Sequence, residues 1–312
     1  MGTSLKKRGF VTIATGKHKY YQMAVDLLKS YKVNGNSSLP FALICDKDCP
    51  EARMFDDVVL ISDPHHSYLD KLSLYKNLPY EETIFIDADA LILAPTAPLW
   101  DDFAQMGDFS CYGRELPLDS KDGWFYYEEM GDLKEQIRFC VSMHGGLYYM
   151  RKTEICKNIF ENAENFVNNY HKYRFAEFSK PADEPVLALS MALAGCKPCN
   201  RESKILFLPS FDGKLRADRR GNLKIGKKNS AAIILHVGNR HIPRFLYQYL
   251  RANILHNYEG KSGIISNKER RKLQWRYLRT DAKFFVRYIL LRIMPEKMIT
   301  AFRTARKRKK NS

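Results

Sequence analysis

Two aspartates, Asp87 and Asp89, lie one residue apart in the apolar stretch TIFIDADALIL at residues 83–93. A hydrophobic strand gains nothing from two neighbouring carboxylates unless another group compensates their charge. Residues one apart on an extended backbone point the same way, so both side chains could reach one divalent cation. Carboxylate and phosphate oxygens suit magnesium or manganese. The pair predicts a metal site for a phosphate-bearing ligand; in the alternative, one aspartate caps a helix and the other is solvated.

An alternation of apolar runs and helical patterns indicates an α/β fold with parallel strands joined by helices. In such a sheet ligands bind beyond the carboxyl ends of the strands, where the run that reaches Asp87 delivers its carboxylates. The expected strands are 9–15, 39–46, 56–61, 83–93, 108–113, 145–150 and 231–238. The expected helices are 19–31, about 68–77, 152–173, 183–195 and 243–257.

The order of these segments resembles glycosyltransferase family 8, which includes glycogenin and bacterial lipopolysaccharide galactosyl- and glucosyltransferases. The resemblance is carried by VTIAT, a helix with tyrosines, a lysine in KLSLYKNLPY and IFIDADALIL, and it spans about residues 9–245. It implies the GT-A fold, a Rossmann-like mixed sheet flanked by helices. It also implies a nucleotide-sugar donor, usually a UDP-sugar, and transfer with retention at the anomeric carbon.

The metal ligands that the resemblance implies are Asp87, Asp89 and a later histidine, which in this sequence is His236. An imidazole at a strand end suits Mn²⁺ (or Mg²⁺) as a third ligand. The alternative for His236 is a core histidine with a hydrogen bond at the strand end.

Further donor-site residues follow from the same resemblance. They comprise a base- and ribose-binding segment, a lysine near the diphosphate, the aspartate motif and two glycine segments: Ala14, Thr15, Tyr20 (or Tyr21), Lys71, Asp87, Ala88, Asp89, His144, Gly146, Gly238 and Arg240. An aromatic ring there could stack on the base, although helix packing explains the tyrosines nearly as well.

The chain departs from the family pattern at several positions. Asp183 and Glu184 occupy the place of an Asp-Gln pair that contacts the transferred sugar, and we expect them to be the catalytic residues that orient its hydroxyl groups. His144 replaces an asparagine, where it either faces the sugar or allows close backbone packing. Ile242 replaces a lysine that grips the diphosphate, and Arg240 or Arg244 could supply that charge.

The net charge of +16 is concentrated at the C-terminal end. Residues 261–312 contain 17 of the 51 Lys and Arg residues and three of the 35 acidic residues, so the first 260 are nearly neutral. Basic residues recur there at helical spacing beside apolar ones, and ARKRKK follows at 305–310. We therefore predict a GT-A glycosyltransferase domain at 1–260 and a basic amphipathic tail at 261–312 that attaches to an anionic membrane surface.

The seven cysteines are odd in number and scattered, and neither a signal peptide nor a membrane-spanning helix is expected. These features favour a cytoplasmic enzyme on the cytosolic face of a membrane, with a glycan or lipid-linked acceptor in cell-surface polysaccharide or lipopolysaccharide synthesis. The alternatives are a phosphatase or nucleotidyltransferase that uses the aspartates for a metal, or a nucleic-acid-binding protein that uses the tail. We do not expect nucleic acid, because the tail lacks the stacking motifs of RNA-binding modules.

Overall fold

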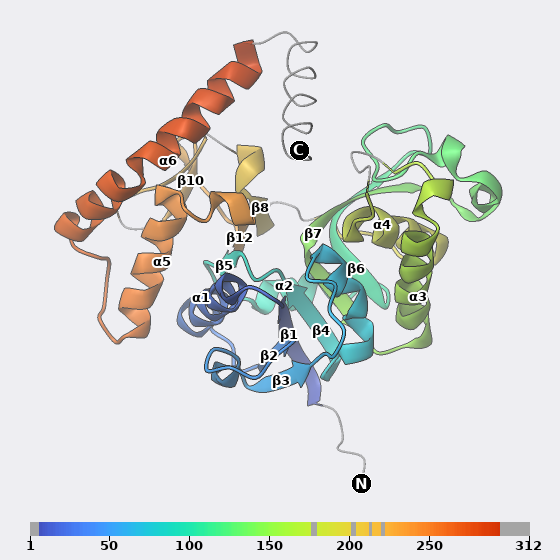
Figure 1. Ribbon diagram of the computed structural model, residues 1–312, viewed down its shortest axis with the longest axis horizontal. Coiled ribbons are helices and arrows are strands. Elements are labelled where there is room, and N and C mark those ends of the chain that lie inside the picture. Colours follow the sequence, from blue (N-terminus) through green and yellow to red (C-terminus); the bar gives the residue numbers. More distant parts are fainter. Residues whose placement is uncertain (1–5, 176–179, 201–203, 212–213, 220–221, 294–312) are drawn as a thin grey trace. The chain divides into compact units, whose positions relative to one another are not determined.

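The computed structural model describes residues 6–175, 180–200, 204–211, 214–219 and 222–293 (Figure 1). The chain forms two compact units. The first contains Met1–Phe207 and Ala231–His236, and the second contains Leu208–Ser230 and Val237–Ser312. The predicted domains at 1–260 and 261–312 are a different division, and that division remains a prediction.

A six-stranded mixed sheet forms the centre of the first unit, in the order β3-β2-β1-β4-β7-β6. Strands β1 to β4 run parallel, whereas β7 is antiparallel to both of its neighbours. The sheet confirms the predicted mixed α/β fold. Its strands are β1 (Lys6–Ala14), β2 (Phe41–Cys45), β3 (Asp57–Leu60), β4 (Tyr80–Ile86), β6 (Phe109–Leu116) and β7 (Cys140–Arg151).

Four α-helices belong to the same unit, α1 (His18–Asn34), α2 (Ala97–Phe103), α3 (Glu154–Asn168) and α4 (Asp183–Leu193). All five residues of β2 are buried, as expected for an apolar strand with both faces covered. In α3 the hydroxyl group of Thr153 caps the first turn by accepting a hydrogen bond from the backbone N–H of Cys156.

The helix predicted at about 68–77 is instead two 3₁₀ segments, Tyr68–Ser73 and Tyr75–Asn77. Pro79 restricts the preceding residue to extended backbone, and the Ser73 hydroxyl donates to the Asp70 carbonyl, which tightens the turn. The tighter winding determines where Lys71 points, so this correction bears on the site.

The apolar stretch 83–93, predicted as one strand, is divided between two sheets. It continues from β4 through a turn at Asp87–Asp89 into β5 (Ala90–Ile92), where the N–H of Ala90 donates to the Asp87 carbonyl over 3.1 Å. Strand β5 pairs with β12 (Ile234–His236), which also pairs with β8 (Ile205–Phe207). The prediction of an extended backbone through both aspartates is therefore wrong, because a turn brings the chain from one sheet to the other.

The described part of the second unit contains a small antiparallel sheet and the helices α5 and α6. The strands are β9 (Leu215–Ala217), β10 (Leu223–Ile225) and β11 (Lys228–Asn229), and the helices are α5 (Phe245–Tyr258) and α6 (Asn267–Ile293). Helix α6 occupies the sequence in which basic amphipathic structure was predicted, whereas ARKRKK at 305–310 lies outside the described residues. Over the described part of the chain, no helix has the length and apolar character needed to span a bilayer.

Candidate active site

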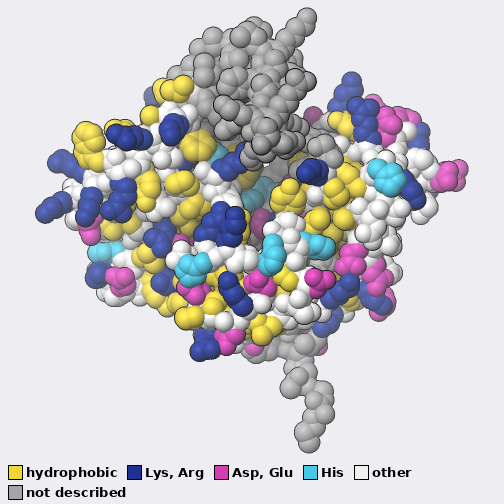
Figure 2. Space-filling view, in the orientation of Figure 1, with side chains coloured by type: hydrophobic (Ala, Val, Ile, Leu, Met, Phe, Trp, Pro, Cys, Tyr) yellow, Lys and Arg dark blue, Asp and Glu magenta, His cyan; other side chains and the backbone are white. Residues whose placement is uncertain are grey.

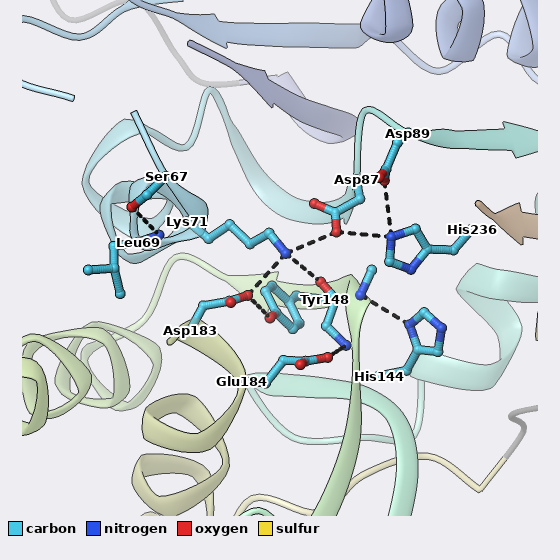
Figure 3. A network of polar contacts seen from close by, with 12 residues as sticks. Ser67, Leu69, Lys71, Asp87, Asp89, His144, Tyr148, Asp183, Glu184 and His236 are labelled. Carbon is cyan, nitrogen blue, oxygen red and sulfur yellow. Dashed lines mark hydrogen bonds and ion pairs between the residues drawn. The ribbon is translucent and has the colours of Figure 1, made fainter. Parts of the chain in front are cut away.

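The aspartate turn and the end of β12 bring three potential metal ligands together. His236 pairs with Ala90 across the β5–β12 ladder, which places its side chain beside the turn. Its Nε2 lies 3.0 Å from Oδ1 of Asp89 and 3.5 Å from Oδ2 of Asp87 (Figure 3). One ligand atom from each residue falls within 4.8 Å of the others. The turn, rather than the alternation of a strand, makes the two carboxylates converge on one imidazole.

Burial and mutual charge determine the protonation of this cluster. The three side chains are only 13–16% exposed. Burial by itself lowers the pKa of His236, but the carboxylates of Asp89 and Asp87 outweigh it and raise that pKa. Burial also opposes ionisation of Asp89, yet the charge of His236 and its hydrogen bond lower the pKa of Asp89. The imidazolium thus holds the position that a divalent cation would take, between the two carboxylates.

The donor set fits a divalent metal ion. Two carboxylate oxygens and one imidazole nitrogen are the ligand types that manganese accepts, and they face one another without rearrangement of the backbone. The Nδ1 atom of His236 is buried and has no hydrogen-bond partner among the described residues. In protein metal sites the second nitrogen of a ligating histidine usually donates a hydrogen bond to a carboxylate, a carbonyl or a water molecule. The described residues supply no such acceptor for Nδ1 of His236.

Lys71 connects the aspartate turn to α4. Its ammonium group lies 2.9 Å from Oδ2 of Asp87, 3.0 Å from Oδ2 of Asp183 and 2.9 Å from the Gly145 carbonyl oxygen. Burial tends to lower the pKa of Lys71, but the carboxylates of Asp183, Asp87 and Glu184 raise it, so the lysine stays charged. The three contacts match the three donors of an ammonium group. Lys71 therefore positions other site residues, and its predicted contact with a diphosphate remains a prediction.

Asp183 and Glu184 form the first turn of α4, where the helix dipole favours negative charge. Oδ2 of Asp183 contacts Lys71 and also accepts a hydrogen bond of 2.8 Å from the Tyr148 hydroxyl. Oε1 of Glu184 accepts a hydrogen bond of 2.7 Å from the Gly145 N–H. Burial and the charge of Asp183 raise the pKa of Glu184 to about 7. Glu184 thus gains a proton near neutrality, beside the ion pair of Asp183 with Lys71.

Gly145 and Gly146 of β7 lie between Glu184 on one side and the imidazoles of His144 and His236 on the other. The register between β6 and β7 is irregular here, since Cys111 pairs with Tyr148 whereas Gly113 pairs with Met143. Such bulges re-aim side chains near functional sites. A Cβ on Gly145 would lie 2.5 Å from Oε1 of Glu184.

The next residue, Gly146, faces the imidazoles of His236 and His144. A Cβ there would lie 2.5 Å from Nδ1 of His236 and 2.9 Å from Cε1 of His144. The backbone of Gly146 also fixes the aspartate turn, because its carbonyl oxygen accepts a hydrogen bond of 3.0 Å from the Asp87 N–H. Both glycines are required by close approach, which agrees with the packing alternative left open for this segment.

His144 belongs to the imidazole side of these glycines. Its ring lies 5.1 Å from the ring of His236 and 5.8 Å from that of Phe207, centroid to centroid. Burial, with the charges of His236 and Lys71, lowers the pKa of His144 to about 3, so the ring is neutral. Its Nε2 is buried and, among the described residues, has no hydrogen-bond partner.

The predicted base- and ribose-binding segment lies at the carboxyl end of β1. Ala14 is the last residue of the strand, and the Thr15 hydroxyl donates to Oδ2 of Asp70 over 2.5 Å. Tyr20 is partly exposed beneath the ammonium group of Lys19, which lies 4.7 Å from its ring centroid. The structure does not test a nucleotide contact for these residues, which remain predictions.

Sequence reasoning missed the residues that brace this segment. Asp46, at the end of β2, accepts hydrogen bonds from the Gly16 N–H over 3.0 Å and from the Tyr21 hydroxyl. Tyr21 is fully buried, whereas Tyr20 is partly exposed. The position of Asp46 directly after a buried strand was a signal for a rim residue. Tyr148 gave no comparable signal, because its partner Asp183 is distant in sequence.

Two predicted diphosphate contacts lie in the second unit. Gly238 has a left-handed backbone (φ 72°) and precedes the 3₁₀ segment Asn239–His241, which contains Arg240. Arg244, the other candidate for the missing charge, lies 3.2 Å from Asp281 and over the ring of Phe284. Arg240 and Gly238 remain predictions, and Arg244 already has an acidic partner within its own unit.

The sequence matches no protein-family model and no curated protein. Solved structures do match the fold. The galactosyltransferase LgtC, solved with donor and acceptor sugar analogues, aligns with a TM-score of 0.50 and 14% identity, covering 85% of this chain and 99% of LgtC. The glycosyltransferase GlyE of Streptococcus pneumoniae TIGR4 aligns with a TM-score of 0.51 and 12% identity, covering 84% of this chain and 66% of GlyE.

The bifunctional glycosyltransferase WbbM aligns with a TM-score of 0.53 and 12% identity, over 82% of this chain and 52% of WbbM. This chain thus corresponds to about half of WbbM and to nearly all of LgtC. At these identities the likeness concerns the fold, and it confirms the predicted GT-A architecture.

Proposed function

We propose that this chain is a metal-dependent glycosyltransferase that moves a sugar from a nucleotide-sugar, a UDP-sugar by the sequence resemblance, to a glycan or lipid-linked acceptor. The observation that carries the proposal is the convergence of Asp87, Asp89 and His236 beside a second pair of acidic residues at the rim of a sheet. The fold shared with glycosyltransferases of known structure supports it.

Asp87, Asp89 and His236 would hold Mn²⁺ or Mg²⁺, which when bound supplies positive charge to the diphosphate leaving group. Lys71 keeps Asp87 and Asp183 at fixed positions on either side of its ammonium group. Tyr148 and Lys71, the polar partners of Asp183 among the described residues, both contact its Oδ2. Its Oδ1 can therefore orient a sugar hydroxyl group. A fixed substrate orientation lowers the barrier before any bond is broken.

Glu184 contributes a second oxygen to the sugar-binding side. The Gly145 N–H fixes one carboxylate oxygen, and its pKa of about 7 lets the group accept or donate a hydrogen bond near neutrality. We assign Asp183 and Glu184 to orientation of the sugar, and transfer with retention is the expected stereochemistry. Proton NMR of the anomeric centre in the first product formed tests it, since an inverted configuration would contradict it.

Release of the nucleotide tests the proposed function directly. We expect the protein to release UDP from at least one member of a panel of UDP-sugars in the presence of Mn²⁺, and to lose this activity with chelation or with Asp89→Ala. Asp101→Ala, which removes an exposed carboxylate on α2, is the matched control and should keep full activity. Release of phosphate from simple phosphomonoesters, with no release of UDP, would favour a phosphatase instead.

Helix α6 supports a site of action at a membrane. One face of the helix exposes four large apolar side chains, with exposed fractions from 53% to 76%: Trp275, Leu278, Phe285 and Val286. The helix also carries exposed basic residues, among them Arg271, Arg276, Arg279 and Lys283. Figure 2 shows Lys and Arg side chains beside hydrophobic ones on the surface in view. Exposed apolar side chains with cationic neighbours are typical of a helix that lies in the interface of an anionic bilayer.

We propose that this face attaches the enzyme peripherally to an anionic membrane surface on its cytosolic side. Sedimentation of the full chain with vesicles of phosphatidylserine and phosphatidylcholine tests the attachment. We expect the double variant Trp275→Ser/Phe285→Ser to lose most of the bound fraction. Ile155→Ser, which removes an exposed apolar side chain from α3, should not change it. Equal sedimentation of all three proteins, or preference for RNA over vesicles, would contradict the proposal.

A further inference from the structure

The two nitrogens of His144 have different chemical roles. Nδ1 accepts a hydrogen bond of 3.1 Å from the backbone N–H of Gly146. An acceptor nitrogen carries no proton, so the ring proton of His144 is on Nε2. Backbone geometry therefore fixes His144 as a donor at Nε2.

This donor lacks an acceptor. Nε2 is buried, and no hydrogen-bond partner lies near it in the described part of the chain. Buried N–H groups without partners are rare in native proteins, and each one calls for an unseen water, ion or ligand. The second nitrogen of His236 is orphaned in the same way, and when its Nε2 serves the metal, Nδ1 also carries a proton. Two neighbouring N–H groups thus call for an oxygen that accepts hydrogen bonds.

The position of His144 indicates which oxygen this is. A Cβ on Gly146 would point at both histidines, whereas a Cβ on Gly145 would point at Glu184. His144 therefore shares the side of the metal ligand His236, with ring centroids 5.1 Å apart. Glu184, proposed to orient the sugar, is instead the residue that contacts Gly145. A group bound beside the metal ligand is the phosphate part of the substrate rather than its sugar.

We infer that His144 is a diphosphate-binding residue that donates a hydrogen bond from Nε2–H to a phosphate oxygen of the nucleotide-sugar. The inference rests on the proposed function, which it deepens, since it assigns the residue to the phosphate and not to the transferred sugar. Because its Nδ1 accepts from the Gly146 N–H, the ring offers a directed donor at Nε2 beside the metal ligand.

Two substitutions isolate the donor. His144→Phe keeps an aromatic ring against Phe207 but removes both nitrogens. His144→Asn lacks a donor at the Nε2 position, but its side-chain oxygen can still accept from the Gly146 N–H. A loss common to both variants is therefore due to Nε2–H. His171→Phe, which changes an exposed histidine, is the control for nonspecific effects.

Calorimetric titrations with magnesium pyrophosphate, magnesium UDP, magnesium UDP-glucose and uridine locate the contact. We expect both His144 variants to bind pyrophosphate and UDP about tenfold more weakly than wild type, with the same loss for UDP-glucose and none for uridine. A loss confined to UDP-glucose would overturn the inference, because the donor would then contact the sugar. Unchanged affinity for pyrophosphate in both variants, or no binding of pyrophosphate by the wild type, would also overturn it.

Imidazole nitrogen NMR provides a readout independent of turnover. We expect His144 to show the Nε2–H tautomer in the free protein, and its Nε2 proton to move downfield on addition of magnesium pyrophosphate. An Nδ1–H tautomer, or no shift at saturating pyrophosphate, would overturn the inference. If pyrophosphate gives the expected results but no UDP-sugar releases UDP, the proposed function fails while the phosphate contact stands.

Discussion

Charged side chains are arranged in opposite ways in the candidate active site and on α6. In the site, Lys71 is 8% exposed and each of its three contacts is to a protein oxygen about 3 Å away. On α6 the basic side chains of Arg271, Arg279 and Lys283 are exposed to solvent. Buried charges depend on their partners, whereas exposed charges are stabilised by water. The contacts of Lys71 fix the positions of the site residues. The exposed charges of α6 can instead bind the anionic membrane surface proposed above.

The largest effect should follow removal of the buried cation. Lys71→Met removes the buried cation that Asp87 and Asp183 share, and we expect the free energy of unfolding to fall by about 3–5 kcal/mol. Lys76→Met, five residues after Lys71, removes an exposed lysine that pairs with Glu164, and should cost less than about 1 kcal/mol. Urea denaturation of both variants measures the difference. Similar losses would mean that the buried carboxylates do not depend on Lys71 for their stability.

Glu184 should give the site a pH-dependent stability that α6 lacks. Its pKa rises from 4.5 to about 7 on folding, so the folded state holds a proton that the unfolded state has released. The contribution to stability is full below pH 4.5 and is lost as the pH rises through about 7.

We expect wild type to lose on the order of 2 kcal/mol relative to Glu184→Gln between pH 4.5 and 7.5. Unfolding free energies of both proteins across this range measure the loss. A constant difference between the two proteins would show that Glu184 titrates as it does in water.

The glycines should affect metal binding more than folding. In Gly146→Ala the new methyl group would lie 2.5 Å from His236, so the imidazole must move from the carboxylates. We expect the affinity for Mn²⁺, measured by calorimetry without substrate, to fall roughly 10–100-fold. Gly107→Ala is the control, because its nearest neighbour would lie at an ordinary 3.7 Å. Equal Mn²⁺ affinities of wild type and Gly146→Ala would show that His236 is not a metal ligand.

Substitutions on α6 should change stability least. Leu278 is 53% exposed, so Leu278→Ser should alter the free energy of unfolding by less than about 0.5 kcal/mol. Its effect should appear instead in the fraction of protein bound to anionic vesicles. Thermal unfolding and vesicle sedimentation of the same preparation measure the two quantities. A large loss of stability would show that this face is part of the core of the second unit.

Sequence periodicity predicted most of the fold because buried strands such as 39–46 and long amphipathic helices such as 152–173 have strong local patterns. It failed at residues 68–77, where Ser73 and Pro79 favour a tighter turn, and at Asp87–Asp89, where a turn looks like a continuous apolar strand. Local patterns do not show which sheet a short strand joins, since pairing partners are distant in sequence.

The candidate site was predicted by residue type but not by arrangement. The aspartates were found because carboxylates are rare in apolar runs, and the structure places His236 beside them. The interactions of Lys71 with Asp183 and of Asp46 with Gly16 were not predictable, because each depends on how separate loops meet. The orphaned nitrogen of His144 similarly appears only when the surrounding side chains are in place.

The three proposed metal ligands come from distant parts of the sequence, because Asp87 and Asp89 precede His236 by nearly 150 residues. During synthesis the aspartate turn leaves the ribosome long before β12 can pair with β5. A nascent chain therefore carries the acidic half of the cluster for several seconds without its imidazole, at about 5–20 residues per second. In the proposed site, metal binding is thereby coupled to the pairing of β12 with β5, so only chains that have formed this pair would be competent.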